Sequence, residues 1–468
     1  MAMTQSPAVE PRPPRRTRTA AIKNADRFWR RTERSVRRTL VWNNVYRATS
    51  YLRSALWIVP FLSILLVLAV APVLRILDNR LAWRITGLGM SGAQSLYQTV
   101  ITLTLSFLVF TFGSLLVAIQ IAGGQLTPRI IATTLLRDTV VKYSVGLFVF
   151  TLVFAVMALD RLERNVHEIV SFVAAVLGLA CMATFLFLID YAARLLRPVS
   201  ILARVGNGGL VVIESVYPNE AGEAPDVVAT ARPLPDAPRR IVRHGGTSEI
   251  VLAVDLETLV REARRANGVI EFVPQVGDFV ACEEPLFVLY GGVVAMGDDD
   301  LRATVAFGVE RTIEQDPLFA FRILVDIALK ALSPAINDPT TAVLALDQIH
   351  RLLRVVGNRQ LRSESIADAA GVLRVIYRTP NWEDFVHLSC HEIRAYGAGN
   401  VQVARRMRAL LDNLVSSLPP YRHEVLGQQI KRLDSTIESL YPIPEDLALA
   451  RIPDSQGLGG SSKGRIST

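Results

Sequence analysis

Polar and charged side chains that could bind a ligand are concentrated in the segment 311–341. Two helices are predicted to meet there, and Ser333, Asn337 and Asp338 crowd their junction. The first turn of a helix presents free N–H groups and a partial positive charge, which favour a bound anion. Two arginines of the same segment could add positive charge. We therefore predict a site for a small anionic ligand, formed by Arg311, Arg322, Asp326, Ser333, Asn337, Asp338, Thr340 and Thr341.

The same residues also have a purely structural interpretation. Asp316-Pro317 and Asp338-Pro339 each match an N-cap residue followed by proline at the first helical position. Arg322, Asp326 and Lys330 are spaced four residues apart, which is typical of an ion-pair ladder on a helix face. Capping and ion pairing explain most of these side chains. They do not explain why hydroxyl and amide groups gather at one junction.

Metal binding and catalysis have weaker support. Glu383, His387, Cys390 and His391 have the spacing of one helix face and could hold zinc. Two histidines and a thiol on a half-buried helix are more often structural, so we predict no metal. The sequence contains no G-x-S-x-G elbow, Walker loop, H-E-x-x-H or dinucleotide fingerprint. No catalytic residue is therefore assigned, and enzyme activity is not predicted.

No cofactor is predicted either. The run Pro274–Val280, followed by Pro285-Leu286, is similar to a hairpin of biotinyl or lipoyl carrier domains. Those carriers attach their cofactor to a lysine on a nearby turn. This chain has no lysine between Lys142 and Lys330, so the segment could share at most the hairpin shape.

The elements that must position any site begin with four long apolar runs. A bilayer crossing requires about 20 mostly apolar residues, and its backbone must be helical. Four runs meet this criterion within residues 54–191, after a basic N-terminal region of residues 1–53. They are Ser54–Leu74, Gln98–Ala122, Thr139–Leu159 and Val166–Ile189.

The charges that flank these runs predict the orientation of the chain. The N-terminal flank, the connection between the second and third runs, and the exit from the fourth carry eleven Lys and Arg residues, against five on the opposite side. Positive charge favours the cytoplasmic side. We therefore predict a multi-pass protein of the inner cell membrane with both termini in the cytoplasm.

The spans and their connections leave two functional alternatives open. Thr99, Thr102, Ser106, Gly113 and Gln120 share one face of the second run, which could line a pore or permit close helix packing. The turn between the second and third runs could be an elbow that couples the membrane part to the cytoplasmic domain, or an ordinary turn. The residues of this elbow are Gln125, Thr127, Pro128 and Arg129.

After the spans, the pattern predicts a cytoplasmic α+β domain. A β-rich part, residues 206–300, contains an amphipathic helix from Asp255 to Ala266 and four strands, at Leu210–Ile213, Ile250–Val254, Val269–Val273 and Leu286–Tyr290. Residues 442–468 form a tail that is predicted to be disordered. A helical part, residues 303–441, contains helices at Leu318–Leu332, Pro339–Val356, Trp382–Tyr396, Val401–Ser417 and Arg422–Leu440.

Three segments together resemble a known family. They are Gln125-Leu-Thr-Pro-Arg129, Ala331-Leu-Ser-Pro-x-x-Asn-Asp-Pro-Thr-Thr-Ala342 and Glu392-Ile-Arg394-Ala-Tyr396-Gly397. The chain from about Arg53 to Tyr441 resembles an uncharacterised family of predicted bacterial membrane proteins, a domain of unknown function. The resemblance implies four spans followed by a cytoplasmic domain, and it implies no reaction, ligand or active site.

Charge and composition narrow the partners. The net charge is +8, but 13 basic residues lie within the first 53, beside a membrane span, and no nucleic-acid-binding motif accompanies them. We predict contact with the lipid bilayer and none with nucleic acid. The leading hypothesis is a channel-like or transport-like homo-oligomer with a cytoplasmic sensing or gating domain. The alternative is a membrane-anchored sensor or scaffold that binds a ligand or partner without transport.

Overall fold

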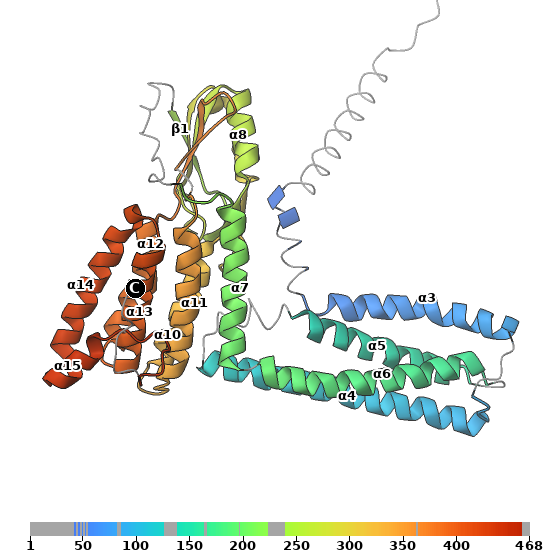
Figure 1. Cartoon of the computed structure of the whole chain (residues 1–468). Coiled ribbons are helices and arrows are strands. Elements are labelled where there is room, and N and C mark those ends of the chain that lie inside the picture. The colour runs from blue at the N-terminus through green and yellow to red at the C-terminus, as the bar shows by residue number, and fades with distance from the viewer. Residues whose placement is uncertain are drawn as a thin grey trace, which may run out of the picture.

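The computed structural model describes residues 55–81, 86–125, 138–162, 166–195, 197–222, 239–361 and 364–460, with single positions between 42 and 52. The chain divides into an elongated bundle of helices and a C-terminal domain of helices and strands (Figure 1). The two parts meet where the last helix of the bundle is followed by helix α7.

The bundle consists of four helices that match the predicted apolar runs. They are α3 (Ile58–Leu81), α4 (Met90–Gln125), α5 (Thr139–Asp160) and α6 (Glu168–Leu195). Helix α5 packs against the other three, and its Phe148, Phe154 and Ala155 are almost completely buried. Large apolar side chains such as Leu105 and Leu186 are more than half exposed on the outside of the bundle. This distribution fits helices that lie in lipid.

Helix α7 (Pro198–Val216) corrects the prediction of a strand at Leu210–Ile213. A run of four apolar residues cannot distinguish a strand from a buried helix by periodicity alone. Proline at the first position starts the helix, and Ile201, Val205 and Ile213 are buried on one of its faces. Among the described residues, five helices are long and apolar enough to cross a membrane, and α7 is the one beyond the four predicted.

The core of the C-terminal domain holds α7 in place. In Figure 1, α7 lies across the direction of α3–α6 and beside α11 (Pro339–Gly357). Glycine permits this close approach, since a Cβ atom at Gly209 would lie 3.0 Å from both Ala320 Cβ and Leu352 Cδ1. One face of α7 is thus part of the domain core.

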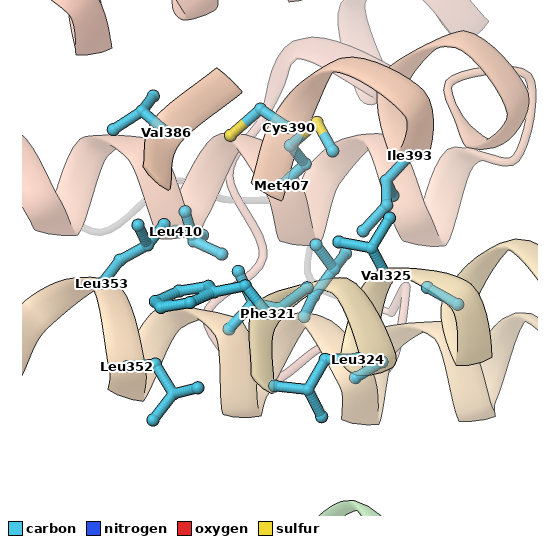
Figure 2. Packing of buried hydrophobic residues seen from close by; sticks show 14 of the residues in the cluster. Phe321, Leu324, Val325, Leu352, Leu353, Val386, Cys390, Ile393, Met407 and Leu410 are labelled. Atoms are coloured by element: carbon cyan, nitrogen blue, oxygen red, sulfur yellow. The ribbon is translucent and has the colours of Figure 1, made fainter. Parts of the chain in front are cut away.

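The helical part of the domain agrees closely with the prediction. The five predicted helices appear within one residue at each end as α10 (Pro317–Ala331), α11, α12 (Trp382–Gly397), α13 (Val401–Ser417) and α14 (His423–Leu440). Figure 2 shows how Phe321, Leu353, Cys390 and Met407 from four of these helices pack into one core. A single-turn helix, Pro420–Arg422, precedes α14.

Two sheets form the other part of the domain. The first has the strand order β1 (Arg239–Arg243), β5 (Pro285–Gly291), β3 (Gly268–Phe272), β8 (Leu373–Tyr377), β7 (Ser365–Ala367), and only β3 and β8 pair in parallel. The second has the order β4 (Phe279–Val280), β2 (Glu249–Val254), β6 (Val305–Gly308). Helix α8 (Leu256–Arg265), capped by Asp255 as predicted, shares their core. Two short helices, Gly292–Ala295 and Asp298–Arg302, precede β6.

The sheets correct two predictions. Strand β4 pairs with β2, whereas β5 pairs with β1 and β3, so residues 274–286 do not form the carrier-like hairpin. Strands β6, β7 and β8 lie within residues 303–441, which were predicted to be helical. The boundary between the two parts of the domain is therefore not a single point in the sequence.

The predicted disordered tail is partly ordered. Helix α15 (Pro444–Arg451) follows α14, and the chain then returns to α13. The side chain of Arg405 donates hydrogen bonds to the carbonyl oxygens of Ile452 and Gly459, at 3.0 and 2.8 Å. Asp454 is 1% exposed. Tertiary contacts order this segment although its composition resembles that of a flexible tail.

Candidate functional site

The structure does not bring the predicted ligand-binding residues together. Arg311 donates a hydrogen bond to Asp316, the N-cap of α10, and lies 5.5 Å from the ring centre of Phe319. The junction 333–341 follows the other end of α10. A helix of 15 residues is about 22 Å long at a rise of 1.5 Å per residue. Arg311 therefore cannot share a small ligand with the junction.

Arg322, the second predicted arginine, is surrounded by carboxylates. Its guanidinium donates two hydrogen bonds to Glu392 of α12, at 2.6 and 2.9 Å, and one to Asp326, at 2.6 Å. These bonds, first of all those to Glu392, raise the pKa of Arg322 above its ordinary value. Two carboxylates compensate its charge, so Arg322 joins α10 to α12 and offers little attraction to an anion.

The junction itself forms a helix cap. Asp338 caps α11 by accepting hydrogen bonds from the Thr341 N–H at 3.1 Å and from the Thr341 hydroxyl at 2.5 Å. The Ser333 hydroxyl donates to the Lys330 carbonyl oxygen, and Asn337 adopts the left-handed conformation with φ of 48°. Thr340 is exposed. The capping interpretation thus accounts for most of this junction.

The Arg322–Glu392 pair makes the stability of the domain depend on pH. Hydrogen bonds from Arg322 hold the pKa of Glu392 below its ordinary value. Such a carboxylate stabilises the fold above its unfolded pKa of about 4.3 and loses this effect as the pH falls through the folded pKa. We expect Glu392→Gln to lower the free energy of unfolding at neutral pH, with a difference that shrinks below pH ~4. Denaturation curves at several pH values measure this.

A matched control is available in the same domain. Glu438 forms an exposed ion pair with Arg451 at 3.4 Å. Exposed pairs contribute little to stability, so Glu438→Gln should behave like wild type across the same pH range. An effect of Glu392→Gln that does not change with pH would contradict an ionised Glu392 as the stabilising group.

The residues considered for zinc are separated by their surroundings. Cys390 is 2% exposed and points into the core between α10, α12 and α13 (Figure 2), whereas Glu383 and His391 are exposed. His387 shares a hydrogen bond with Gln429, at 3.0 Å. Within the described ranges, no group of three or more His, Cys, Asp or Glu residues could hold a metal ion.

The thiol groups offer a direct test of this packing. Burial raises the pKa of Cys390 to about 12, so its thiolate, the form that reacts with alkylating agents, is almost absent at neutral pH. Cys282 is exposed. We expect iodoacetamide to modify Cys282 in the native protein and Cys390 only after unfolding, as measured by peptide mass spectrometry. Labelling of native Cys390 at the rate of Cys282 would show that the core of α12 opens readily.

The predicted elbow lies largely outside the described residues. Thr127, Pro128 and Arg129 are not among them, and Gln125 is known only as the last residue of α4. The short helix expected after this turn also falls outside them. Among the described residues, Asp138, immediately before α5, makes a contact between the two parts of the chain.

Asp138, Tyr191 and Arg204 form what we call the clamp. The Asp138 carboxylate accepts hydrogen bonds from the Tyr191 hydroxyl of α6, at 2.6 Å, and from Arg204 of α7, at 2.7 Å. It also caps α5 through the Val141 N–H. Burial raises the pKa of Asp138, but the bonds from Tyr191 and Arg204 outweigh this and leave its pKa below the ordinary value. At the centre of the clamp is the ionised Asp138 carboxylate, whose side chain is 3% exposed. The clamp joins α5 and α6 to α7.

A cavity of about 410 Å³ lies between the sheets and the helical part of the C-terminal domain. The ends of the parallel strands β3 and β8 open into it, as do the first residues of α8 and α10. Sites in proteins of mixed helices and strands often lie at such strand ends and between domains. Its walls include Trp42, Ser215, Tyr217, Asp255, Glu257, Phe272, Gln275, Gln315, Asp316, Tyr377 and Arg378. We call this space the interdomain cavity.

The walls of the interdomain cavity combine aromatic and acidic groups. Asp316 is buried and accepts a hydrogen bond from Arg311, and Gln315 accepts a hydrogen bond from the Val254 N–H at 3.2 Å. Asp255 caps α8, while Glu257 is exposed. The balance of charge favours a neutral or cationic molecule over an anion. The capping aspartates were recognised in the sequence, but Tyr377 and Arg378 were missed because strand β8 was not predicted.

Comparison with known proteins places the chain in a family. A model of the family described as "Predicted membrane protein (DUF2254)" matches residues 53–413. The chain is 25% identical over 413 residues to uncharacterized protein Mb1321c of Mycobacterium bovis and to uncharacterized protein Rv1290c of Mycobacterium tuberculosis. Each alignment covers 85% of this chain and 78% of the relative. No solved structure matches. The chain therefore belongs to the DUF2254 family of predicted membrane proteins, in agreement with the resemblance in its sequence.

Proposed function

We propose that this protein is a membrane-embedded sensor. Its C-terminal domain, which we expect in the cytoplasm from the charges of the loops, binds a small neutral or cationic molecule in the interdomain cavity. Binding changes the position of α7, and α7 passes that change to the four-helix bundle. The bilayer is a partner of the bundle, whose helices expose large apolar side chains such as Leu105 and Leu186.

The observation that carries this proposal is the position of α7 between the two parts of the chain. Ile201, Val205 and Ile213 pack in the core of the C-terminal domain. Arg204, on the same helix, is held by the Asp138 carboxylate of the bundle. The end of α7 also forms a wall of the interdomain cavity through Ser215 and Tyr217. A ligand in this cavity would therefore touch the helix that contacts the membrane part.

A ligand screen on the full-length protein in lipid nanodiscs tests the proposal. Compounds that raise the unfolding temperature of wild type should fail to do so with Ser215→Trp, because the ring fills the cavity. Val211→Trp is the matched control, since Val211 is 66% exposed on the same helix. The proposal is rejected if the screen yields no stabilising compound, or if Ser215→Trp responds like the control.

Transport by an oligomer is a second candidate function, and the surface of α4 supports it. Thr99, Thr102, Ser106, Gly113 and Gln120 are all exposed on the outside of the bundle. The hydroxyl groups of the first three donate hydrogen bonds to carbonyl oxygens of their own helix. Packing within one protomer therefore does not cover this face, and polar groups in a membrane usually face protein or water. Copies of the chain would line a pathway with it.

Flux measurements decide between the two candidates. Purified protein in lipid vesicles should release a trapped ion or small solute if the polar face of α4 lines a pathway, and Ser106→Trp should block that release. Leu179→Trp is the control, because Leu179 is 68% exposed on α6. If the vesicles stay impermeable to every solute and the protein is a monomer, transport is rejected and the sensor function remains.

A further inference from the structure

A second cavity in the C-terminal domain is rich in arginine. It has a volume of about 680 Å³ and lies along the second half of α11, beside the segment that follows α7. Arg351, Arg354 and Arg359 line it, together with Asn358 and the acidic residues Glu220 and Asp347. Arg351, Arg354 and Asn358 are spaced three and four residues apart, so they share one face of the helix. We call this space the arginine cleft.

The arginines of this cleft differ from those of the predicted site. Arg311 and Arg322 each bond to a carboxylate, as described above. In the part of the chain that the structure describes, no carboxylate lies within ion-pair distance of Arg351 or Arg354. Arg351 donates a hydrogen bond to the neutral Asn207 amide, at 2.8 Å. The cleft therefore contains guanidinium groups whose charge is not compensated by direct pairs.

Two of the three acidic groups around the cleft already have a cationic partner. Asp347 accepts a hydrogen bond from Arg406 of α13, at 2.6 Å. Glu214 of α7 lies 3.7 Å from Arg359, and the Glu214 side chain is 59% exposed, which makes this pair weak. Glu220 lines the cleft and forms a β-bridge with Arg359 through its backbone. Three arginines thus face one carboxylate that has no pair among the described residues.

We propose that the arginine cleft binds an anion that carries a phosphate group. Arg354 offers a planar pair of donors for two phosphate oxygens, and Arg351 and Arg359, which line the same cleft, add positive charge. The proposal is independent of the interdomain cavity. It keeps the predicted class of ligand, a small anion, but assigns it to residues that the sequence analysis did not select.

Binding at this cleft would also affect α7. Arg351 and Arg359 contact Asn207 and Glu214, which both belong to α7. An anion that attracts the two guanidinium groups competes with these contacts. The cleft is therefore suited to regulate the helix that carries Arg204 of the clamp.

Titrations of the full-length protein in nanodiscs test the cleft. Two sources of phosphate are compared: soluble pyrophosphate with phosphatidylcholine nanodiscs, and nanodiscs that contain phosphatidylglycerol. At least one should raise the unfolding temperature of wild type. Arg354→Gln should raise the concentration of the phosphate probe that gives half of this stabilisation roughly tenfold or more, because a bidentate, charge-assisted contact is lost. Circular dichroism verifies that the variant is folded.

Arg265→Gln is the matched control, since the Arg265 side chain is 82% exposed on α8. A response to pyrophosphate that Arg354→Gln weakens identifies a soluble phosphate compound. A response only to phosphatidylglycerol, again weakened by Arg354→Gln, identifies a lipid headgroup. The proposal is overturned if neither probe stabilises wild type. It is also overturned if Arg354→Gln and Arg265→Gln respond equally, which indicates general charge screening.

Discussion

Arg405→Met is expected to lower the free energy of unfolding of the C-terminal domain by about 3–5 kcal/mol, since breaking a buried charged network leaves unpaired groups behind. Arg405 is completely buried, and it donates to two carbonyl oxygens of the segment that follows α15. Its own carbonyl oxygen accepts a hydrogen bond from the Asp454 N–H at 3.1 Å. Methionine fills most of the volume but supplies no donor.

The second expected effect of Arg405→Met is the release of residues 452–460 from α13. Burial raises the pKa of Asp454, but hydrogen bonds from the backbone of Gly459 and Gln456 outweigh this, so its pKa is lowered. An ionised, 1% exposed carboxylate near Arg405 loses a compensating charge in the variant. Limited proteolysis should therefore cut after α15 in Arg405→Met while the wild-type segment stays protected.

Arg408→Met is the matched control for Arg405→Met. It removes another arginine of α13 that does not bind the described residues after α15. Arg408 pairs with Asp412 and Asp434, and its side chain is 24% exposed. We expect a loss of about 1 kcal/mol, which is typical of partly exposed pairs, and no new cleavage. Equal stability of the Arg405 and Arg408 variants in denaturant would disprove the importance of the buried arginine.

Arg204→Met is expected to destabilise the contact between the bundle and α7 by about 2–3 kcal/mol. Removal of one partner from a fully buried pair costs about 3–5 kcal/mol, and water screens part of this because the Arg204 side chain is 36% exposed. The Asp138 carboxylate keeps the Tyr191 hydroxyl and the Val141 N–H as donors. It loses its only cationic partner among the described residues.

A double-mutant cycle in nanodiscs measures the clamp. Asp138→Asn, Arg204→Met and the double variant are compared by thermal unfolding and by protease access to the chain between α6 and α7. If the pair interacts directly, the double variant is less destabilised than the sum of the two single variants. Arg197→Met, which alters an exposed arginine just before α7, should have little effect. Simple additivity of the two single variants would argue against the clamp as a coupling contact.

Individual helices and strands can be predicted from the sequence where a local pattern of residues defines them. Helices α10 to α14 have apolar residues at helical spacing, and Asp255, Asp316 and Asp338 mark three helix starts by their capping chemistry. The four apolar runs can be predicted as helices from their length and apolar composition alone. Strands β2, β3 and β5 could be recognised because each is a short apolar run between turn residues.

The errors occurred where distant contacts outweigh local preference. Strand β8 has only the three-residue strand β7 as a partner nearby in sequence, and it joins the rest of the sheet by parallel pairing with β3, far earlier in the chain. The apolar run Leu210–Ile213 predicts a strand, but it belongs to α7, whose helical form depends on packing against α10 and α11. The segment after Tyr441 has the composition of a flexible tail, but Arg405 orders it.

The sequence by itself determined that this chain has apolar helices that fit a membrane and a C-terminal domain of helices and strands. It also contains the three segments that mark its family. Length, apolar content and caps are local properties, so they can be read without a fold. Only the tertiary structure decided which charges are compensated. Asp326 is the partner that helical spacing predicts for Arg322, whereas the pairing of Arg311 with Asp316 and of Arg322 with Glu392 depends on the fold. No local pattern distinguishes Arg351 and Arg354, because their lack of a carboxylate partner among the described residues is a property of the fold. The charge that a ligand meets depends on neighbours that the fold brings from distant parts of the chain.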